Sequence, residues 1–249
     1  MTASLSPEDH AKTGEVALVV GVGPGLGRSL CAVFAEAGMT VAAGARDVAR
    51  LNADLDALPA DIRARITAYP VDVTVKESVD ALVAAVRESL GVPDLVVYNA
   101  GTHKRGGLLE IEAADLEAAW RSACLGAFHV AQAAVRAMAP RESGTLLFTG
   151  ATASLRGGAG FINLAVPKFG LRALAQSIAR EYQPQGLHVA HVVVDGQIDG
   201  PKLRARQPDR DPATTLDRDA MARTYLALHR QDKRAWTQEI DLRPAPERF

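Results

Sequence analysis

Val20-Gly21-Val22-Gly23-Pro24-Gly25-Leu26-Gly27 stands near the start of the chain and predicts how the rest of it folds. An apolar run at 16–20 precedes it and predicts a buried strand, while 28–37 carries apolar residues at helical spacing. A strand, a glycine-rich turn and a helix present backbone N–H groups and a positive helix end to a phosphate. Glycine suits such a turn because a Cβ would block both the chain reversal and the approach of the phosphate. A glycine-rich turn without any ligand is the alternative, since a bare glycine pattern is a weak signal.

The composition is that of one ordinary globular domain. The chain has 249 residues, of which 48% are hydrophobic and 23% charged, and its net charge is −1. This charge gives no electrostatic reason to expect a nucleic-acid or membrane partner. Residues 1–14 lack a basic and an apolar region, and no apolar run reaches the ~18 residues that span a bilayer. We therefore expect a cytoplasmic protein with a loose leader at 1–14 and, from its cysteine spacing, no metal site.

Predicted strands and helices alternate along the remainder, residues 15–249. We expect strands at 16–20, 38–45, 66–73, 93–98, 145–148, 188–194 and 237–242. We expect helices at 28–37, 48–58, 76–90, 116–138, 165–182 and 217–230, with the start of the fifth open to a shift toward Pro167. This order predicts a single-domain α/β Rossmann fold, a doubly wound parallel sheet of about seven strands with helices on both faces.

Polar and glycine residues gather where the predicted strands end. In a parallel sheet of this kind, ligands bind outside the carboxyl ends of the strands, at the switch in strand order. The segments at such ends are Gly21–Gly27, Arg46, Asp72, Asn99–Gly101, Thr149–Ser154 and Asp195-Gly196. The pattern therefore predicts one binding site built from several strand ends.

Over nearly its whole length the chain resembles the short-chain dehydrogenase/reductase family. The glycine spacing Gly21-x-x-x-Gly25-Leu26-Gly27, the Asn99-Ala100-Gly101 triplet and Asp72-Val73 match motifs of that family, and Lys168 matches the lysine of its YxxxK motif. The resemblance implies a dinucleotide cofactor and a small-molecule substrate. The cofactor-binding residues that it implies are Gly21, Gly25, Leu26, Gly27, Arg46, Asp72, Val73, Asn99, Gly101, Lys168, Gly196 and Ile198.

The residue after the second predicted strand bears on which cofactor binds. Enzymes that prefer NAD usually place an acid there to accept a hydrogen bond from the ribose 2′-hydroxyl. Here Ala45 is followed by Arg46, whose guanidinium suits a 2′-phosphate. We expect NADP rather than NAD, with a plain surface arginine beside Asp47 as the alternative.

The positions where the family has catalytic side chains differ in this chain. The tyrosine that the family places four residues before the lysine falls on Leu164, its serine on Ala151 and its asparagine on Ala123. These aliphatic side chains can neither donate nor accept a proton, and a general acid contributes roughly 10²–10⁴ in rate. A slip of one residue would place Thr152 at the serine position. The resemblance is therefore to an atypical member without the catalytic Tyr, Ser and Asn.

His103 and Lys168 remain as candidate catalytic residues. His103 lies two residues past Gly101, and histidine titrates near neutral pH. A solvated loop histidine and a helix-surface lysine are the respective alternatives. Asn163 could supply a hydrogen bond or cap a helix, and Asp195 could be a functional acid or a loop cap. His129, His188 and His191 fit core or interface roles instead.

Three functions remain open on these residues. The first is an NADP-dependent oxidoreductase acting on a small organic substrate without the usual tyrosine. The second is a non-redox lyase, isomerase or cyclase, and the third a catalytically silent dinucleotide-binding protein. Residues 197–216 resemble the family's substrate lid, either a solvated loop or a clamp for an anionic substrate. The resemblance also implies a homotetramer or a homodimer.

Overall fold

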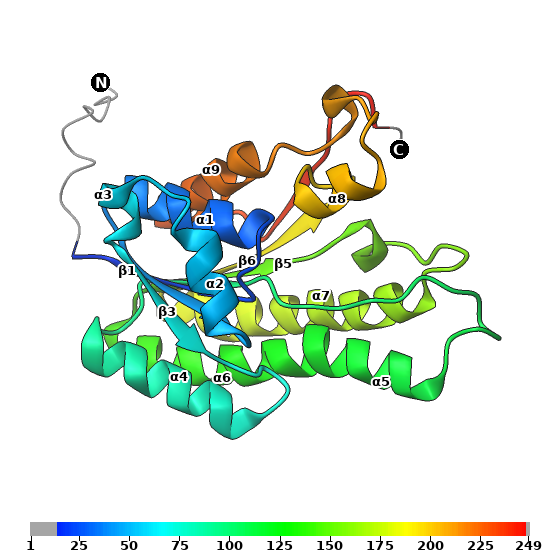
Figure 1. Ribbon diagram of the computed structural model, residues 1–249. Helices are drawn as coiled ribbons and strands as arrows, with labels where there is room; N and C mark the ends of the chain where they lie inside the picture. The colour runs from blue at the N-terminus through cyan, green and yellow to red at the C-terminus, as the bar shows by residue number, and fades with distance from the viewer. Residues whose placement is uncertain (1–13, 248–249) are drawn as a thin grey trace.

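The chain folds around one seven-stranded sheet, in which every neighbouring pair of strands is parallel (Figure 1). The computed structural model describes residues 14–247, so the leader predicted at 1–14 lies outside the described residues except for Gly14. The strands are β1 (Val16–Val20), β2 (Thr40–Ala45), β3 (Ile66–Pro70), β4 (Leu95–Tyr98), β5 (Gly144–Thr149), β6 (Leu187–Val194) and β7 (Glu239–Leu242). Their order across the sheet is β3-β2-β1-β4-β5-β6-β7. The predicted doubly wound parallel sheet is confirmed.

Helices cover both faces of the sheet (Figure 1). One face carries α1 (Leu26–Glu36), α2 (Val48–Leu55), α3 (Ala60–Arg63) and α9 (Arg218–His229). The other carries α4 (Lys76–Ser89), α5 (Ala113–Trp120), α6 (Gly126–Met138) and α7 (Ile162–Tyr182). The short helix α8 (Pro201–Arg206) stands apart from both layers. Single helical turns complete the set: η2 (Arg121–Leu125, π-helical), η3 (Ala139–Arg141), η4 (Thr152–Ser154), η5 (Gln183–Gln185), η6 (Pro212–Thr214) and η7 (Lys233–Ala235).

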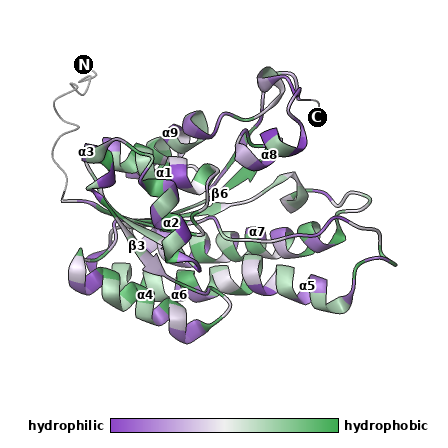
Figure 2. Cartoon of the chain, in the orientation of Figure 1, coloured by the Kyte–Doolittle hydropathy of each residue, from purple (hydrophilic) through white to green (hydrophobic). Residues whose placement is uncertain are grey.

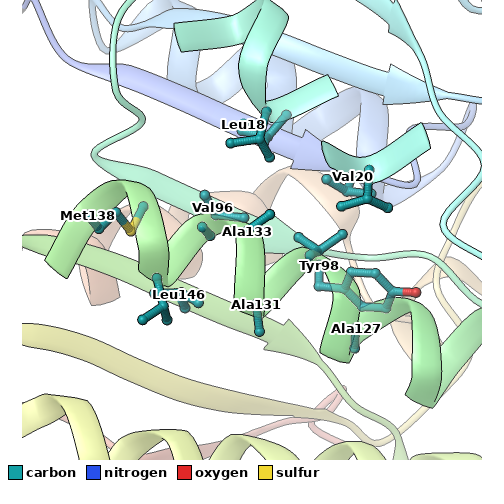
Figure 3. Close-up of a cluster of buried hydrophobic side chains, with 14 of the residues drawn as sticks. Leu18, Val20, Val96, Tyr98, Ala127, Ala131, Ala133, Met138 and Leu146 are labelled. Atoms are coloured by element: carbon teal, nitrogen blue, oxygen red, sulfur yellow. The ribbon is translucent and has the colours of Figure 1, made fainter. Parts of the chain in front are cut away.

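Each face of the sheet has its own hydrophobic core. Alternate side chains of one strand point to opposite faces, so Leu18 joins one core and its neighbour Val19 the other. Figure 3 shows Leu18 and Tyr98 of the strands on the same side as Ala127 and Met138 of α6. Each covering helix carries both hydrophobic and hydrophilic residues (Figure 2), as its amphipathic spacing predicts. Burial on both faces explains why the strands read as continuous apolar runs.

The strand order also places the site. From β1 the chain proceeds outward to β2 and β3, and then returns to β4 on the other side of β1. The connections that follow β1 and β4 therefore leave the sheet in opposite directions and open a crevice between them. The glycine turn after β1 and the Asn99-Ala100-Gly101 triplet after β4 meet at this crevice, because Asn99 Nδ2 donates to the Gly21 carbonyl oxygen at 3.0 Å.

The long helix predicted at 116–138 is interrupted. It begins earlier, at Ala113, and contains the π-helical turn η2 before α6 continues to Met138. The buried Tyr98 hydroxyl donates to the Ser122 carbonyl oxygen inside this turn. A π turn misaligns backbone groups locally, and the Tyr98 hydroxyl gives one of them a partner. Sequence periodicity does not reveal this interruption, because the hydrogen bond comes from a strand.

The helix predicted at 165–182 begins earlier than expected, so the shift toward Pro167 was wrong. Helix α7 starts at Ile162, with Phe161 before it and Pro167 inside it. The Phe161 carbonyl oxygen accepts from the N–H groups of Leu164 and Ala165, which closes the first turn. Pro167 removes a single N–H donor. Packing of the buried face of α7 on the sheet offsets that loss.

The segment at 197–216 is more ordered than a loop without periodicity. It contains α8, which begins at Pro201 after Gly200, and the single turn η6. Proline suits the first helical position, because its fixed φ matches the helix and its missing N–H would have had no helical partner there. The sequence pattern missed α8 because six residues are too few to show a helical period. Likewise, the helix predicted at 48–58 ends at Leu55, and α3 follows Pro59.

Residues 14–247 contain neither a membrane-spanning helix nor a cluster of metal-ligating side chains. None of the helices in this range is long and apolar enough to cross a membrane. Nor does this range bring together three or more His, Cys, Asp or Glu side chains that could hold a metal ion.

Candidate functional site

The glycine turn between β1 and α1 owes its shape to close backbone contacts. Gly21 has a φ of +92°, and a Cβ there would lie 2.4 Å from the Ala100 backbone nitrogen. A Cβ on Gly27 would lie 2.8 Å from Val22 Cα. Both positions therefore require glycine for steric reasons.

The opposite side of the same turn is open. A Cβ on Gly23 or Gly25 would meet nothing within 4 Å. Gly25 precedes Leu26 at the start of α1, and this first turn has neither a side-chain cap nor an acidic residue. The turn lines a cleft of about 270 Å³, whose other wall is formed by residues 198–203. Exposed backbone N–H groups at the positive end of a helix suit the pyrophosphate of a dinucleotide, so the residues present fit such a group.

Asp72 and Val73 follow β3, and their side chains lie in different environments. Asp72 Oδ1 accepts hydrogen bonds from the Thr74 hydroxyl at 2.7 Å and the Thr74 N–H at 2.9 Å. These bonds are the main reason that the pKa of Asp72 lies below its ordinary value, with a smaller contribution from the Arg46 cation. Val73 is buried, and its carbonyl oxygen lies 3.1 Å from His129 Nδ1. Asp72 is thus a stable carboxylate at the sheet edge, while Val73 belongs to the packing beneath it.

Arg46 lies exposed directly after β2. The neighbouring acid is already engaged, since Asp47 Oδ1 accepts from the Arg50 N–H at 2.9 Å and caps the start of α2. The Arg46 cation contributes to the lowered pKa of Asp72, which follows β3. The strand end therefore presents a cation.

Gly196 and Ile198 lie where the chain leaves β6. Gly196 has a φ of +151°, and a Cβ there would come within 2.9 Å of Pro244. Ile198 forms an isolated parallel bridge with Leu216, so the two ends of the segment 197–216 are joined. Ile198 lines the 270 Å³ cleft beside the glycine turn, whereas Gly196 lines a larger neighbouring cavity. This segment thus borders both spaces.

Lys168 is buried in α7, which excludes the surface lysine that the sequence left open. Its Nζ donates to the Thr149 carbonyl oxygen at the end of β5, at 2.6 Å. Burial lowers the pKa of Lys168 to about 8, because removal from water penalises the charged ammonium. The side chain is therefore held by the strand end and is able to exchange a proton near neutral pH.

His103 lies on the exposed loop after Gly101. This loop is tied to α7, because the Lys104 N–H donates to Asn163 Oδ1 at 3.1 Å. Asn163 is buried inside α7 and so serves as a hydrogen-bond acceptor rather than a helix cap. The pKa of His103 is lowered, mainly by partial desolvation and further by the cations of Arg206 and Lys168. His103 and Lys168 are thus within electrostatic reach of one another.

A cavity of about 770 Å³ adjoins His103 and the end of β6. Leu164 and Ala151 line it, whereas Ala123 is buried in η2. The same wall carries Asp195, whose carboxylate accepts from the Thr152 hydroxyl and forms an ion pair with Arg243 at 3.2 Å. The space beside Leu164 is therefore an open cavity of mixed polarity, of a size that accommodates small organic ligands.

The three remaining histidines of the sequence analysis have structural partners. His129 lies against the Val73 carbonyl, and His188 Nε2 lies 2.9 Å from the Thr237 carbonyl oxygen. His191 Nδ1 lies 2.9 Å from the Glu239 carboxylate, which also pairs with Arg172. The contacts of His188 and His191 tie β6 to the segment of β7 and to α7, and that of His129 ties α6 to the segment after β3, in keeping with the core roles that the sequence predicts.

Comparison with known proteins agrees with this architecture. Residues 15–210 match the family model of the short chain dehydrogenases. The 3-oxoacyl-acyl-carrier-protein reductase FabG of Thermotoga maritima is 26% identical over 84% of this chain and 84% of its own. The same reductase of Escherichia coli is 27% identical over 79% of each chain. A short-chain dehydrogenase structure from Rhodopseudomonas palustris superposes with a TM-score of 0.80 at 33% identity, covering 94% of this chain and 100% of its own.

The chain belongs to the short-chain dehydrogenase family. The two curated relatives named above are reductases, and the present protein is an oxidoreductase of the same fold.

Sequence reasoning missed several contacts around the cavity. It named Thr152 and Asp195 separately, but not their hydrogen bond or the pairing with Arg243. It did not anticipate that Asn163 holds the loop of His103. These groups are distant in the sequence, and only the meeting of strand ends brings them together. The one available signal was that Thr152 and Asp195 both follow predicted strands.

Proposed function

We propose that the protein is an atypical NADP(H)-dependent oxidoreductase that acts on a small organic substrate without the usual tyrosine proton donor. The observation that carries this proposal is the 770 Å³ cavity, which joins His103 and Leu164 beside the cofactor cleft. Bound NADPH would supply the two-electron reduction of the substrate. Holding substrate and cofactor in reacting geometry supplies much of the catalysis of such a transfer.

The cofactor-binding residues of this proposal are those that the sequence nominates. Gly21, Gly25, Leu26 and Gly27 face the pyrophosphate, and Arg46 pairs with the 2′-phosphate of NADP. The Arg46 guanidinium directly after β2 supports NADP over NAD, and one oxygen of the neighbouring Asp47 carboxylate already accepts from the Arg50 N–H. The other members of the set are Asp72, Val73, Asn99, Gly101, Lys168, Gly196 and Ile198.

The proposed chemistry uses two side chains. His103 in its protonated form delivers a proton to the substrate oxygen, and its lowered pKa makes it a stronger acid than an ordinary histidine. Lys168, held at the Thr149 carbonyl oxygen, would bind the ribose of the cofactor and supply positive charge to the site. Leu164 and Ala151 contribute shape and exclude water. Activity should therefore fall as the pH rises through the titration of His103.

Turnover of NADPH with small ketones, imines and activated alkenes tests the proposal. We expect loss of NADPH absorbance only when both substrate and enzyme are present. Lys168→Met should lower kcat about 100-fold, whereas Leu164→Ala should lower it less than about tenfold, since leucine moves no proton. Full activity in His103→Ala would remove His103 from the mechanism. Turnover without a change in cofactor redox state would favour a lyase or isomerase, and binding without turnover a silent protein.

We also propose a homodimer, or a homotetramer built from two of them. Helix α7 lies beside the interrupted helix formed by α5, η2 and α6 (Figure 1), and these helices expose Trp120, Phe128 and Phe169. Exposed aromatic residues on neighbouring helices are typical of a protein interface. Light scattering of the wild type and of Phe169→Glu tests this, and a monomeric wild type would contradict it. Cytoplasmic localisation stays a prediction of the sequence.

A further inference from the structure

The cavity beside Leu164 has an unusual balance of charge. Four arginines line it: Arg105, Arg156, Arg206 and Arg210. Two carboxylates line it as well, those of Asp195 and Glu247. The Asp195 carboxylate already binds the Thr152 hydroxyl and the Arg243 guanidinium. The cavity thus holds more positive charge than its own carboxylates neutralise.

Among residues 14–247, none of these four arginines forms an ion pair with a carboxylate. Helix α8 shows the contrast within one element. Arg204 makes two hydrogen bonds to the Asp199 carboxylate, at 2.8 and 2.6 Å. Arg206, two residues later, faces the cavity instead, and its cation helps to lower the pKa of His103. The charge of Arg206 therefore acts inside the cavity.

The arginines come from three separate strand ends. Arg105 follows β4, and its guanidinium lies 5.0 Å from the centre of the Phe161 ring. Its loop is held by the Gly106 N–H, which donates to the Gly160 carbonyl oxygen at 3.0 Å. Arg156 follows β5 and η4, while Arg206 and Arg210 follow β6. The Arg210 Nε is buried and has no hydrogen-bond partner in the part of the chain that the structure describes.

Part of the remaining wall of the cavity is apolar. Phe161, Leu164 and Val194 contribute to it. A ligand that fits both kinds of surface has a charged end among the guanidinium groups and an uncharged body against these three side chains. Guanidinium groups bind carboxylate and phosphate with paired, charge-assisted hydrogen bonds.

We propose that this cavity selects a small organic anion, whose carboxylate or phosphate end is bound by Arg105, Arg156, Arg206 and Arg210. The proposal names the substrate class of the function proposed above and rests on it. The uncharged body of the anion lies over Leu164, next to His103. In the proposed function, the pyrophosphate of the cofactor would lie in the separate cleft at the start of α1.

Calorimetric titration with three probes tests this, each measured with and without NADP⁺. The probes are acetoacetate, its neutral methyl ester and acetonylphosphonate. Loss of one charge-assisted interaction weakens binding by roughly tenfold or more. We therefore expect the acetoacetate anion to bind about tenfold or more tightly than the ester, and its affinity to fall with added salt. The ratio between acetoacetate and acetonylphosphonate identifies which anion the arginines prefer.

Two variants and one matched control locate the effect. Arg156→Gln and Arg206→Gln should each reduce the preference of acetoacetate over its ester by about tenfold. Arg204→Gln, on the same helix but paired with Asp199, should leave that preference unchanged. Equal binding of ester and anion, or an equal loss in Arg204→Gln, would overturn the proposal. Thermal unfolding of every variant separates lost affinity from lost folding.

The two proposals fail in different ways. If the anion preference holds but NADPH is never consumed, the proposed oxidoreductase function is wrong and the anion site stands. If NADPH reduces neutral and anionic ketones with equal kcat/KM, the function stands and the anion site is wrong.

Discussion

The two halves of the site owe their shapes to different kinds of contact. The cofactor half, around Gly21 and Gly27, is shaped by backbone contacts closer than any Cβ would permit. The substrate half, around Leu164 and His103, is shaped by side chains on loops that follow β4, β5 and β6. The first half leaves little freedom to change a residue without losing the turn. The second half can change residue by residue, which is why chemistry can differ between proteins of one fold.

Gly21→Ala should have the largest effect on the cofactor half. The new Cβ would overlap the Ala100 backbone, and alanine at a φ of +92° is strained by roughly 1–3 kcal/mol on its own. We expect a loss of at least this much unfolding free energy in urea, together with loss of NADP binding. Gly23→Ala is the matched control, since its Cβ meets nothing within 4 Å. Equal stability of the two variants would show that the turn is not held by backbone contact.

Lys168 lies where the two halves meet, and its burial can be tested by the pH dependence of the free energy of unfolding. Its pKa is about 8 in the folded chain and near 10.4 unfolded, so the unfolded chain binds more protons between these values. The contribution of Lys168 to stability should therefore rise with pH across this window, by about 1.4 kcal/mol per unit. Subtracting the urea stability of Lys168→Met from that of the wild type at each pH isolates this slope. A flat difference would mean that Lys168 is solvated.

Arg46→Gln tests the cofactor half of the site through one side chain outside the glycine turn. Removal of the guanidinium should weaken NADP binding roughly tenfold, because a charge-assisted phosphate contact is lost. NAD binding should stay nearly constant, since NAD lacks the 2′-phosphate. Dissociation constants for both cofactors, in the wild type and the variant, check this. Tighter binding of NAD than NADP by the wild type would contradict the cofactor assignment.

Arg206→Gln should have the smallest effect, on the substrate half. The Arg206 cation lowers the pKa of His103, although less than desolvation does. Its removal should raise that pKa, which NMR titration of the His103 ring measures. Arg204→Gln should leave the titration unchanged, because Arg204 is paired with Asp199. An unchanged His103 pKa in Arg206→Gln would place its charge outside the cavity.

Much of the fold and part of the site follow from local pattern. The apolar runs predict all seven strands, and the glycine spacing predicts the turn between β1 and α1. The helix boundaries were less predictable. Pro167 suggested a late start for α7, yet one missing N–H is tolerated within a 21-residue helix. The π turn at 121–125 depends on Tyr98, which is remote in the sequence.

The sequence by itself determined the alternation of elements, the glycine turn and the aliphatic residues at 123, 151 and 164, because these depend only on neighbours in the chain. Only the tertiary structure decided that Lys168 is buried at the end of β5, that Asn163 holds the loop of His103, and that four arginines from separate strand ends meet at one cavity. Burial and charge neutralisation depend on what surrounds a group in space. A parallel sheet supplies those surroundings by bringing strand ends that are distant in the sequence to one edge.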